Sequence, residues 1–254
     1  MVESVEMTKK IVVYTCITGS YDELLEPVEI EEGVDYYCVS DRPPKQESVW
    51  AYLPLPRDFG SPSLNNRYVK MHPHILFPDY EFSLYVDGNI RIMANVSDLV
   101  FEAMKVSVLA LYQHSYRSCV YQEAVECSLL GHDWLWRISR QMRRYSREGF
   151  PFSDGLYENN VIIRDNSDQK LKNLMDLWWD EYSNYVKRDQ LSLVFLSWKK
   201  SLKIHNLGPS DPRGDNNIFK LKSVHVDNSF SIRFCRFINR WLIKFGFFRV
   251  PGRF

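Results

Sequence analysis

The 254-residue chain is long enough for one large α/β domain, or for one domain with a small appendage. Its formal net charge of +0 gives no overall basic excess, so a broad nucleic-acid-binding surface is not implied. The five cysteines, at positions 16, 38, 119, 127 and 235, include no CxxC pair, which argues against a thiolate zinc site and favours a reducing compartment.

The chain begins with MVESVEMTKK, which lacks the apolar core of a signal peptide, and no apolar run reaches the length of a membrane span. We therefore expect a cytoplasmic protein. The first expected strand, residues 10–16, is rich in β-branched residues and leads into the turn Thr18-Gly19-Ser20-Tyr21-Asp22. A second strand, residues 35–40, ends at Asp41, and residues 48–55 read as a third.

The rest of the chain continues this alternation of strands and helices. Strands are expected at residues 81–86, 107–111 and 156–164; helices are expected at 65–74, from Ser97 (with Ser97 or Asp98 as its cap), and at 121–130, 133–148, 168–185, 188–199 and 229–247; residues 206–217 read as a loop. The fold class predicted from this alternation is α/β, with a mostly parallel sheet flanked by helices.

The expected strand at residues 81–86 stops abruptly at Asp87-Gly88-Asn89. An acid and a second oxygen ligand at the end of a buried strand could hold a hard divalent cation against a diphosphate. The same three residue types are also favoured in β-turns, so a plain turn is the alternative. The surrounding chain favours the metal interpretation, because polar groups also follow the two earlier strands, at Thr18–Asp22 and Asp41.

Arg67 and Lys70 are three residues apart on the expected helix before Asp87, so they share a helix face. Paired cations on the face towards the sheet edge would suit a diphosphate, and the alternative is a solvated helix face.

Further polar clusters come later in the chain. His114, Arg117 and Glu123 follow the strand at 107–111. They could act as general acid–base groups or as sugar contacts, and the alternative is a structural His–Glu pair. Tyr157 and Glu158 begin the strand at 156–164 and are candidates for the acceptor side of a site. Asp189 either belongs to the site or is only a favourable first-turn charge.

Taken in order, these segments resemble the plant mucilage and pectin galacturonosyltransferase-like family, which also has bacterial members associated with surface polysaccharides. The likeness covers roughly residues 11–200 and rests on YTCITGSYD, DYYCVSD, NNRYVKMHPHILFPDYEFSLYVDGNI, HSYRSCVYQEA, REGFPFSDGLYENNVIIRD and LWWDEYSNYVKRDQLSLVFLSWK. The resemblance implies a GT-A-type fold, meaning a Rossmann-like nucleotide-sugar domain with a divalent-metal motif.

The resemblance also implies roles for single residues. The groups facing the nucleotide and its diphosphate would be Thr18, Gly19, Tyr21, Asp22, Asp41, Arg67 and Lys70. Asp87 would take the metal-binding position of an Asp-x-Asp motif, with Asn89 as a weaker neutral ligand and His225, or else His205, as a third. Asp189-Gln190 is similar to an Asp-Gln pair near the transferred sugar in some retaining GT-A enzymes.

We therefore expect a glycosyltransferase that moves a sugar from a nucleoside-diphosphate donor, with UDP and Mn²⁺ or Mg²⁺, to a glycan or lipid-linked glycan acceptor in surface polysaccharide synthesis. Asp189, Glu158 and Gln190 are the expected catalytic residues, and His114, Arg117, Glu123 and Tyr157 the expected acceptor contacts. The alternatives are a non-catalytic nucleotide-sugar or glycan-binding module and a membrane-peripheral scaffold.

Residues 229–254 carry six basic residues and no acidic one. We expect residues 1–228 to form the GT-A-like domain and residues 229–254 a basic amphipathic helix or tail. Such a helix, with Phe and Trp on one face, either contacts the inner face of a membrane or packs on the domain with its arginines in water.

Overall fold

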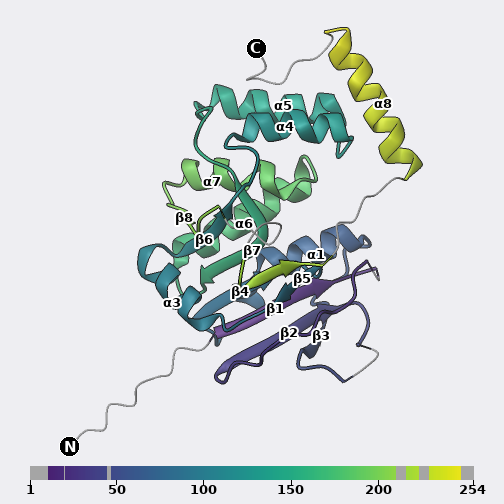
Figure 1. Ribbon diagram of the computed structural model, residues 1–254. Coiled ribbons are helices and arrows are strands. Elements are labelled where there is room, and N and C mark those ends of the chain that lie inside the picture. The colour runs from purple at the N-terminus through teal and green to yellow at the C-terminus, as the bar shows by residue number, and fades with distance from the viewer. Residues whose placement is uncertain (1–10, 20, 45–46, 210–215, 223–228, 247–254) are drawn as a thin grey trace, which may run out of the picture.

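The computed structural model describes residues 11–19, 21–44, 47–209, 216–222 and 229–246, and its centre is a seven-stranded sheet with helices on both faces (Figure 1). The strand order is β3-β2-β1-β4-β7-β6-β8, and a second sheet pairs β5 with β9. The strands are β1 (Ile11–Ile17), β2 (Val34–Ser40), β3 (Ala51–Pro54), β4 (Phe82–Val86), β5 (Ile90–Ile92), β6 (Leu109–Gln113), β7 (Tyr157–Asp165), β8 (His205–Asn206) and β9 (Phe219–Leu221).

The helices divide between the two faces of the large sheet. They are α1 (Pro62–Met71), α2 (Pro73–Leu76), α3 (Ser97–Val106), α4 (Val120–Leu130), α5 (Leu135–Arg147), α6 (Gln169–Asn184), the 3₁₀ helix η1 (Asp189–Leu191), α7 (Leu193–Lys199) and α8 (Phe230–Lys244). One core contains residues of α1 and α4 to α7, and the other contains residues of α3 and the small sheet. Every residue of β1 is buried, because its alternate side chains enter the two cores.

Strand β7 decides which residues meet at the edge of the sheet. It pairs antiparallel with both β4 and β6, whereas β1, β2, β3 and β4 run parallel. The beginning of β7 therefore lies beside the carboxyl ends of β4 and β6, and the amide of Asp87 donates to the carbonyl of Asn160 at 2.9 Å. The sheet brings Asp87 and Glu158 to the same edge, although 70 residues of chain separate them.

Three expected elements differ from the structure. The helix expected at residues 65–74 is two helices, because Pro73 has no amide to continue α1 and instead begins α2. The helix expected at 188–199 is likewise divided into η1 and α7. Neither Ser97 nor Asp98 caps α3; the Glu31 carboxylate accepts the amides of Val96 and Ser97 instead.

The C-terminal helix α8 packs against α4 at one end of the molecule (Figure 1). It begins at Phe230 and ends at Lys244, so it is slightly shorter than expected. None of the described helices combines the length and the apolar character of a bilayer-spanning segment.

Candidate active site

A pocket of about 390 Å³ lies where the carboxyl ends of β1 and β4 meet the first turns of α1. This is the edge at which open α/β sheets bind ligands. The lining residues are Cys16, Thr18, Gly19, Tyr21, Asp22, Pro62, Ser63, Asn66, Arg67, Asp87, Gly88 and Asn89. The pocket thus gathers the polar residues expected from two separate strand ends and from the helix before β4.

Arg67 and Asp87, which line the pocket, form a network with the buried side chains of Lys70 and Asp189, and we call these four the buried ion-pair network. The Lys70 Nζ atom lies 3.3 Å from Asp87 Oδ1 and 3.0 Å from Asp189 Oδ2, and the Lys70 side chain is only 1% exposed. Arg67 Nε lies 3.1 Å from the same Asp189 oxygen. The buried ammonium group of Lys70 therefore links Asp87, at the end of β4, to Asp189, which lies about a hundred residues later in the sequence.

The sequence predicted that Arg67 and Lys70 share a face of α1 towards the sheet edge, and both do reach the site. Their environments differ, however. Arg67 lines the pocket with its side chain 26% exposed, whereas Lys70 is covered and already paired with two carboxylates. Only Arg67 is thus placed for direct contact with a ligand in the pocket.

Asp189 is held in place by its backbone as well as by its charge. The Trp178 indole Nε1 donates to the Asp189 carbonyl at 3.1 Å, and Trp178 is a fully buried core residue of α6. Burial of the Asp189 carboxyl opposes its ionisation, but the charges of Arg67, Lys70 and Arg188 outweigh this and hold its pKa well below the ordinary value. The side chain is therefore an anion at neutral pH, and besides its place in the first turn of η1 it pairs with two cations of α1.

This pKa shift predicts how the stability depends on pH. A carboxylate whose pKa is lower in the folded state stabilises the protein above its unfolded pKa of about 3.9, and that contribution is lost as the pH falls towards the folded value. The difference in unfolding free energy between wild type and Asp189→Asn should stay constant from about pH 8 to 5 and shrink only below about pH 4. Urea unfolding at a series of pH values measures it, and a difference that disappears near pH 6 would contradict the lowered pKa.

Tyr85 belongs to the site although sequence reasoning missed it. Its hydroxyl donates to Asp87 Oδ1 at 2.9 Å, and the Lys70 ammonium lies 5.0 Å from the centre of its ring. Burial, and then the neighbouring Asp87 charge, raise the pKa of Tyr85 well above its ordinary value, so the hydroxyl remains a donor. Alternate residues of a strand face the same side of the sheet, so the spacing of Tyr85 and Asp87 could have indicated that the two side chains lie together.

The loop after β1 is fixed by hydrogen bonds to its neighbours. The Gly19 amide donates to Asp41 Oδ2 at 2.9 Å, and the Thr18 hydroxyl donates to the carbonyl of Pro62 at 2.8 Å. Gly19 has a φ of +66°, and a Cβ there would lie 3.0 Å from Pro62. Asp41 therefore ties β2 to the β1 loop. It also lines a second pocket of about 650 Å³, which shares Asp22 with the first.

The expected metal ligands are only partly brought together. Asp87 and Asn89 line the first pocket, whereas His205 is on β8, separated from β4 by β7 and β6, and His225 lies outside the described residues. In the part of the chain that the structure describes, no three His, Cys, Asp or Glu side chains form a ready group of metal ligands. The oxygen donors of Asp87 and Asn89 nevertheless suit a hard cation whose remaining ligands are phosphate and water.

A second buried polar cluster adjoins Asp189 and contains His114, Arg117, Glu123, Glu158 and Gln190. The Gln190 amide donates to Glu158 Oε2 at 3.1 Å, and Arg117 Nε pairs with Glu123 Oε2 at 2.6 Å. His114 Nε2 lies 3.6 Å from Glu158 and 3.7 Å from Glu123. The expected catalytic residues and acceptor residues are thus contiguous, and Tyr157 joins them through its carbonyl, which accepts from Gln190 at 3.4 Å.

The hydrogen bonds of His114 indicate its tautomer. Its Nδ1 atom accepts the amides of Tyr116 and Arg117, both at 3.1 Å, so Nδ1 carries no proton. In the neutral ring the proton is therefore on Nε2, the atom that faces the two glutamates. This tautomer is compatible with both interpretations of His114 from the sequence. A structural His–Glu pair and a general acid–base group would both carry the proton on Nε2.

The sequence of this chain is similar to that of known proteins. The profile of the family described as TOD1/MUCI70, glycosyltransferase-like domain matches residues 56–214, more than half of the chain. The "Probable hexosyltransferase MUCI70" of Arabidopsis thaliana is 24% identical in an alignment of 211 residues, and the match covers 72% of this chain and 36% of the plant protein. This chain therefore spans about a third of the length of that relative.

Mouse xyloside xylosyltransferase 1, in its apo form, superposes with a TM-score of 0.50 over 78% of this chain and 85% of the mouse chain, at 12% sequence identity. The strand order and this likeness define an α/β protein of the GT-A type, which confirms the fold class predicted from the sequence. The chain belongs to the TOD1/MUCI70 glycosyltransferase-like family. The resemblance seen in the sequence is thereby confirmed.

Proposed function

We propose that this protein is a glycosyltransferase that takes a hexose from a UDP-sugar and transfers it to a hydroxyl of a glycan or lipid-linked glycan in surface polysaccharide synthesis. The observation that carries the proposal is the buried Lys70 ammonium, which pairs with Asp87 at the strand end and with Asp189 of the Asp-Gln pair. Burying a lysine between two carboxylates carries a large desolvation penalty, which the ion pairs only partly offset. We therefore interpret the buried Lys70 as a residue that holds the side chains of the site in position.

The two adjoining pockets suit the two parts of a nucleotide-sugar. We propose that the larger pocket, near Asp41, holds the nucleoside and that the smaller pocket holds the diphosphate and the sugar. Arg67 lines the smaller pocket and would offer its guanidinium to the diphosphate. Gly19 and Gly88 also line this pocket, and their lack of a side chain lets its walls pack closely, because a Cβ would lie 3.0 Å from Pro62 at Gly19 and 3.0 Å from Asp22 at Gly88.

We propose that a divalent cation, Mn²⁺ or Mg²⁺, binds with the donor. Asp87 and Asn89 would hold it, because they are the strand-end oxygen donors that line the smaller pocket. When bound, the cation would neutralise charge on the leaving diphosphate. The Tyr85 hydroxyl and Lys70 both contact Asp87 Oδ1, which orients the carboxylate and leaves Oδ2 for the ligand.

On the acceptor side we propose that Glu158, Asp189 and Gln190 lie near the anomeric carbon. Asp189 would stabilise positive charge on the sugar ring, since it remains anionic, and Gln190 would be oriented by Glu158. Arg117 is the most exposed member of the second cluster, at 27%, and would contact the acceptor. We propose retention of configuration, on the likeness of the Asp-Gln pair alone.

A thermal-shift screen of UDP-, GDP- and CMP-sugars, each with and without Mn²⁺, tests this function. We expect UDP-hexoses to raise the melting temperature, and to do so more in the presence of Mn²⁺, because a ligand that binds only the folded state stabilises it. Binding without release of UDP would indicate a non-catalytic sugar-binding module. No shift with any donor would contradict the proposal.

A further inference from the structure

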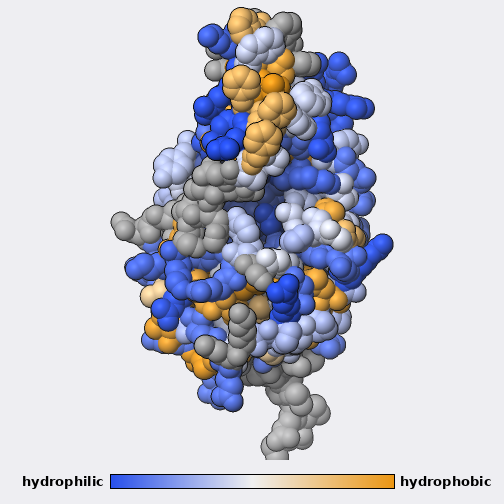
Figure 2. Space-filling model, turned by 90° about the vertical axis from the view of Figure 1, so that its right-hand side faces the viewer, coloured by the Kyte–Doolittle hydropathy of each residue, from blue (hydrophilic) through white to orange (hydrophobic). Residues whose placement is uncertain are grey.

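The outer face of α8 is a row of exposed aromatic side chains. Its members recur at intervals of three or four residues along the helix, so they form one stripe. They are Phe230, Phe234, Phe237, Trp241 and Phe245, exposed by 76%, 49%, 65%, 46% and 57%. Figure 2 shows apolar side chains gathered at this end of the molecule, on the same face as a central hollow. Contiguous apolar side chains exposed on a protein surface commonly mark a site of protein or membrane interaction.

Helix α8 is attached to the domain by Leu242 and Ile243, which pack against the main core, and by a set of polar contacts. Asn239 is fully buried, accepts the Leu135 amide, and donates to the carbonyls of Ser128 and Asp133, each at 2.9 Å. Arg236 and Arg240 donate to the carbonyls of Leu130 and Leu129 at 3.1 and 3.2 Å. These contacts satisfy carbonyls at the C-terminal end of α4, where a helix leaves them unpaired and where its dipole favours cations.

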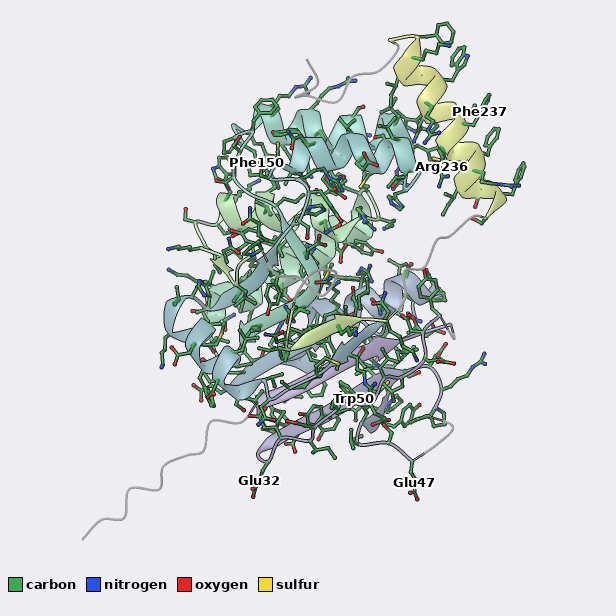
Figure 3. All side chains as sticks on the ribbon, viewed as in Figure 1. Glu32, Glu47, Trp50, Phe150, Arg236 and Phe237 are labelled. Carbon is green, nitrogen blue, oxygen red and sulfur yellow. The ribbon has the colours of Figure 1, made fainter. Side chains whose placement is uncertain are left out.

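The docking of α8 is close and specific. Gly131 ends α4 with a φ of +75°, and a Cβ there would lie 2.7 Å from the Ile232 carbonyl and 2.8 Å from the Arg236 amide. In Figure 3, Arg236 extends towards α4 while Phe237 points away from it. The sequence offered two alternatives, a membrane contact or a helix packed with its arginines in water. The structure combines a packed helix with exposed aromatic rings.

Helix α5 extends this surface. Trp134 packs edge-on against Phe234 and stacks on Trp136, with ring centres 4.6 Å apart in the stacked pair. The exposed arginines of α5 are Arg137, Arg140, Arg143 and Arg147, and α8 adds exposed Arg233, Arg240 and Lys244. Neither helix contains an acidic residue. We call this surface of α5 and α8 the aromatic–basic end.

We propose that the aromatic–basic end binds the surface of a membrane rich in anionic lipids. Phe and Trp rings insert at the level of the headgroups, while arginine and lysine pair with lipid phosphates. Charge favours this occupant over a second copy of the chain, because two copies joined here would bring two basic helices together. The proposal goes beyond the transfer reaction and uses none of the residues of the donor pockets.

Sedimentation of the whole protein with vesicles tests the proposal. We expect it to pellet with vesicles of phosphatidylcholine and phosphatidylglycerol, and much less with phosphatidylcholine alone or at high salt. Phe237→Ser with Trp241→Ser should weaken binding at least about tenfold, and Arg140→Gln with Arg143→Gln about tenfold to thirtyfold. Ile30→Ser with Val106→Ser is the matched control, since both residues are exposed and apolar but distant from α8 in the chain.

The results separate the possible occupants of this surface. Loss of binding in the two α5/α8 variants but not in the control, with unchanged donor-induced thermal shifts, supports the proposal. Equal vesicle binding by all variants overturns it. So does a wild-type dimer, measured by light scattering, that the aromatic substitutions dissociate, because a second copy would then cover the rings. If the double substitution does not fold, Phe237→Ser alone provides the same comparison.

Discussion

Replacing Asp87 with Asn should lower the rate of sugar transfer by about 10²–10³-fold while the protein keeps its fold. The substitution removes one negative charge from the end of β4 but keeps the shape and the ability to accept from Tyr85. It takes away the carboxylate that we propose to hold the divalent cation, and it leaves Lys70 paired with Asp189 alone. UDP release under saturating donor and acceptor measures the effect.

Asp79→Asn is the matched control for this experiment. Asp79 is an exposed aspartate in the turn before β4, so it lies near the opposite end of the same strand. Its substitution should change the rate less than about twofold, as expected for a surface position away from the site. If Asp87→Asn is folded and as active as Asp79→Asn, then Asp87 has no role in transfer and the proposed metal position is wrong.

Lys70→Met should lower the free energy of unfolding by about 3 kcal/mol. Methionine fills a similar volume, so the loss comes chiefly from electrostatics. Without the ammonium group, Asp87 and Asp189 face each other with one fewer cation between them. We place the effect at the lower end of the range for broken buried pairs, because Arg67 still pairs with Asp189. Urea unfolding followed by circular dichroism measures it.

Lys105→Met removes a lysine of the same kind from an exposed pair. Lys105 bonds to Glu102 one turn away, and both side chains are about two-thirds exposed, at 67% and 70%. The expected loss is below about 0.5 kcal/mol. Equal losses in the two variants would mean that Lys70 is not held in a buried network. A smaller loss for Lys70→Met combined with Asp189→Asn than the sum of the two single losses would show their coupling directly.

Much of the site could be predicted because it depends on local pattern. Apolar strands that end in polar groups indicated which residues lie at the carboxyl edge, and the spacing of three put Arg67 and Lys70 on one face of α1. The helical spacing of Trp178 from Leu174 and Tyr182 indicates a core residue, and Trp178 is fully buried. Such features require only the periods of strands and helices and the direction of parallel strands.

The remaining features depend on pairings that sequence patterns do not contain. Strand β7 runs antiparallel, and this direction brings Glu158 to the edge that already holds Asp87. The burial of Lys70 follows from the packing of α1 on α6 and η1, so its double pairing could not be read from its spacing.

The amphipathic pattern of α8 was correctly seen but did not show which side faces the domain. An apolar stripe normally faces a core. Here Leu242 and Ile243 pack against the core, while Asn239 and two arginines satisfy carbonyls at the end of α4. The aromatic stripe is left exposed, and the sequence of α8 alone gives no information about which helix it packs against.

We propose the pocket between β1, β4 and α1 as the donor site. A crystal grown with UDP and Mn²⁺ tests this assignment, because anomalous scattering locates the metal without assumptions about the ligand. We predict a manganese peak beside Asp87, with the diphosphate next to Arg67 and the nucleoside towards Asp41. Nucleotide density elsewhere on the protein, with this pocket filled only by water, would contradict the account.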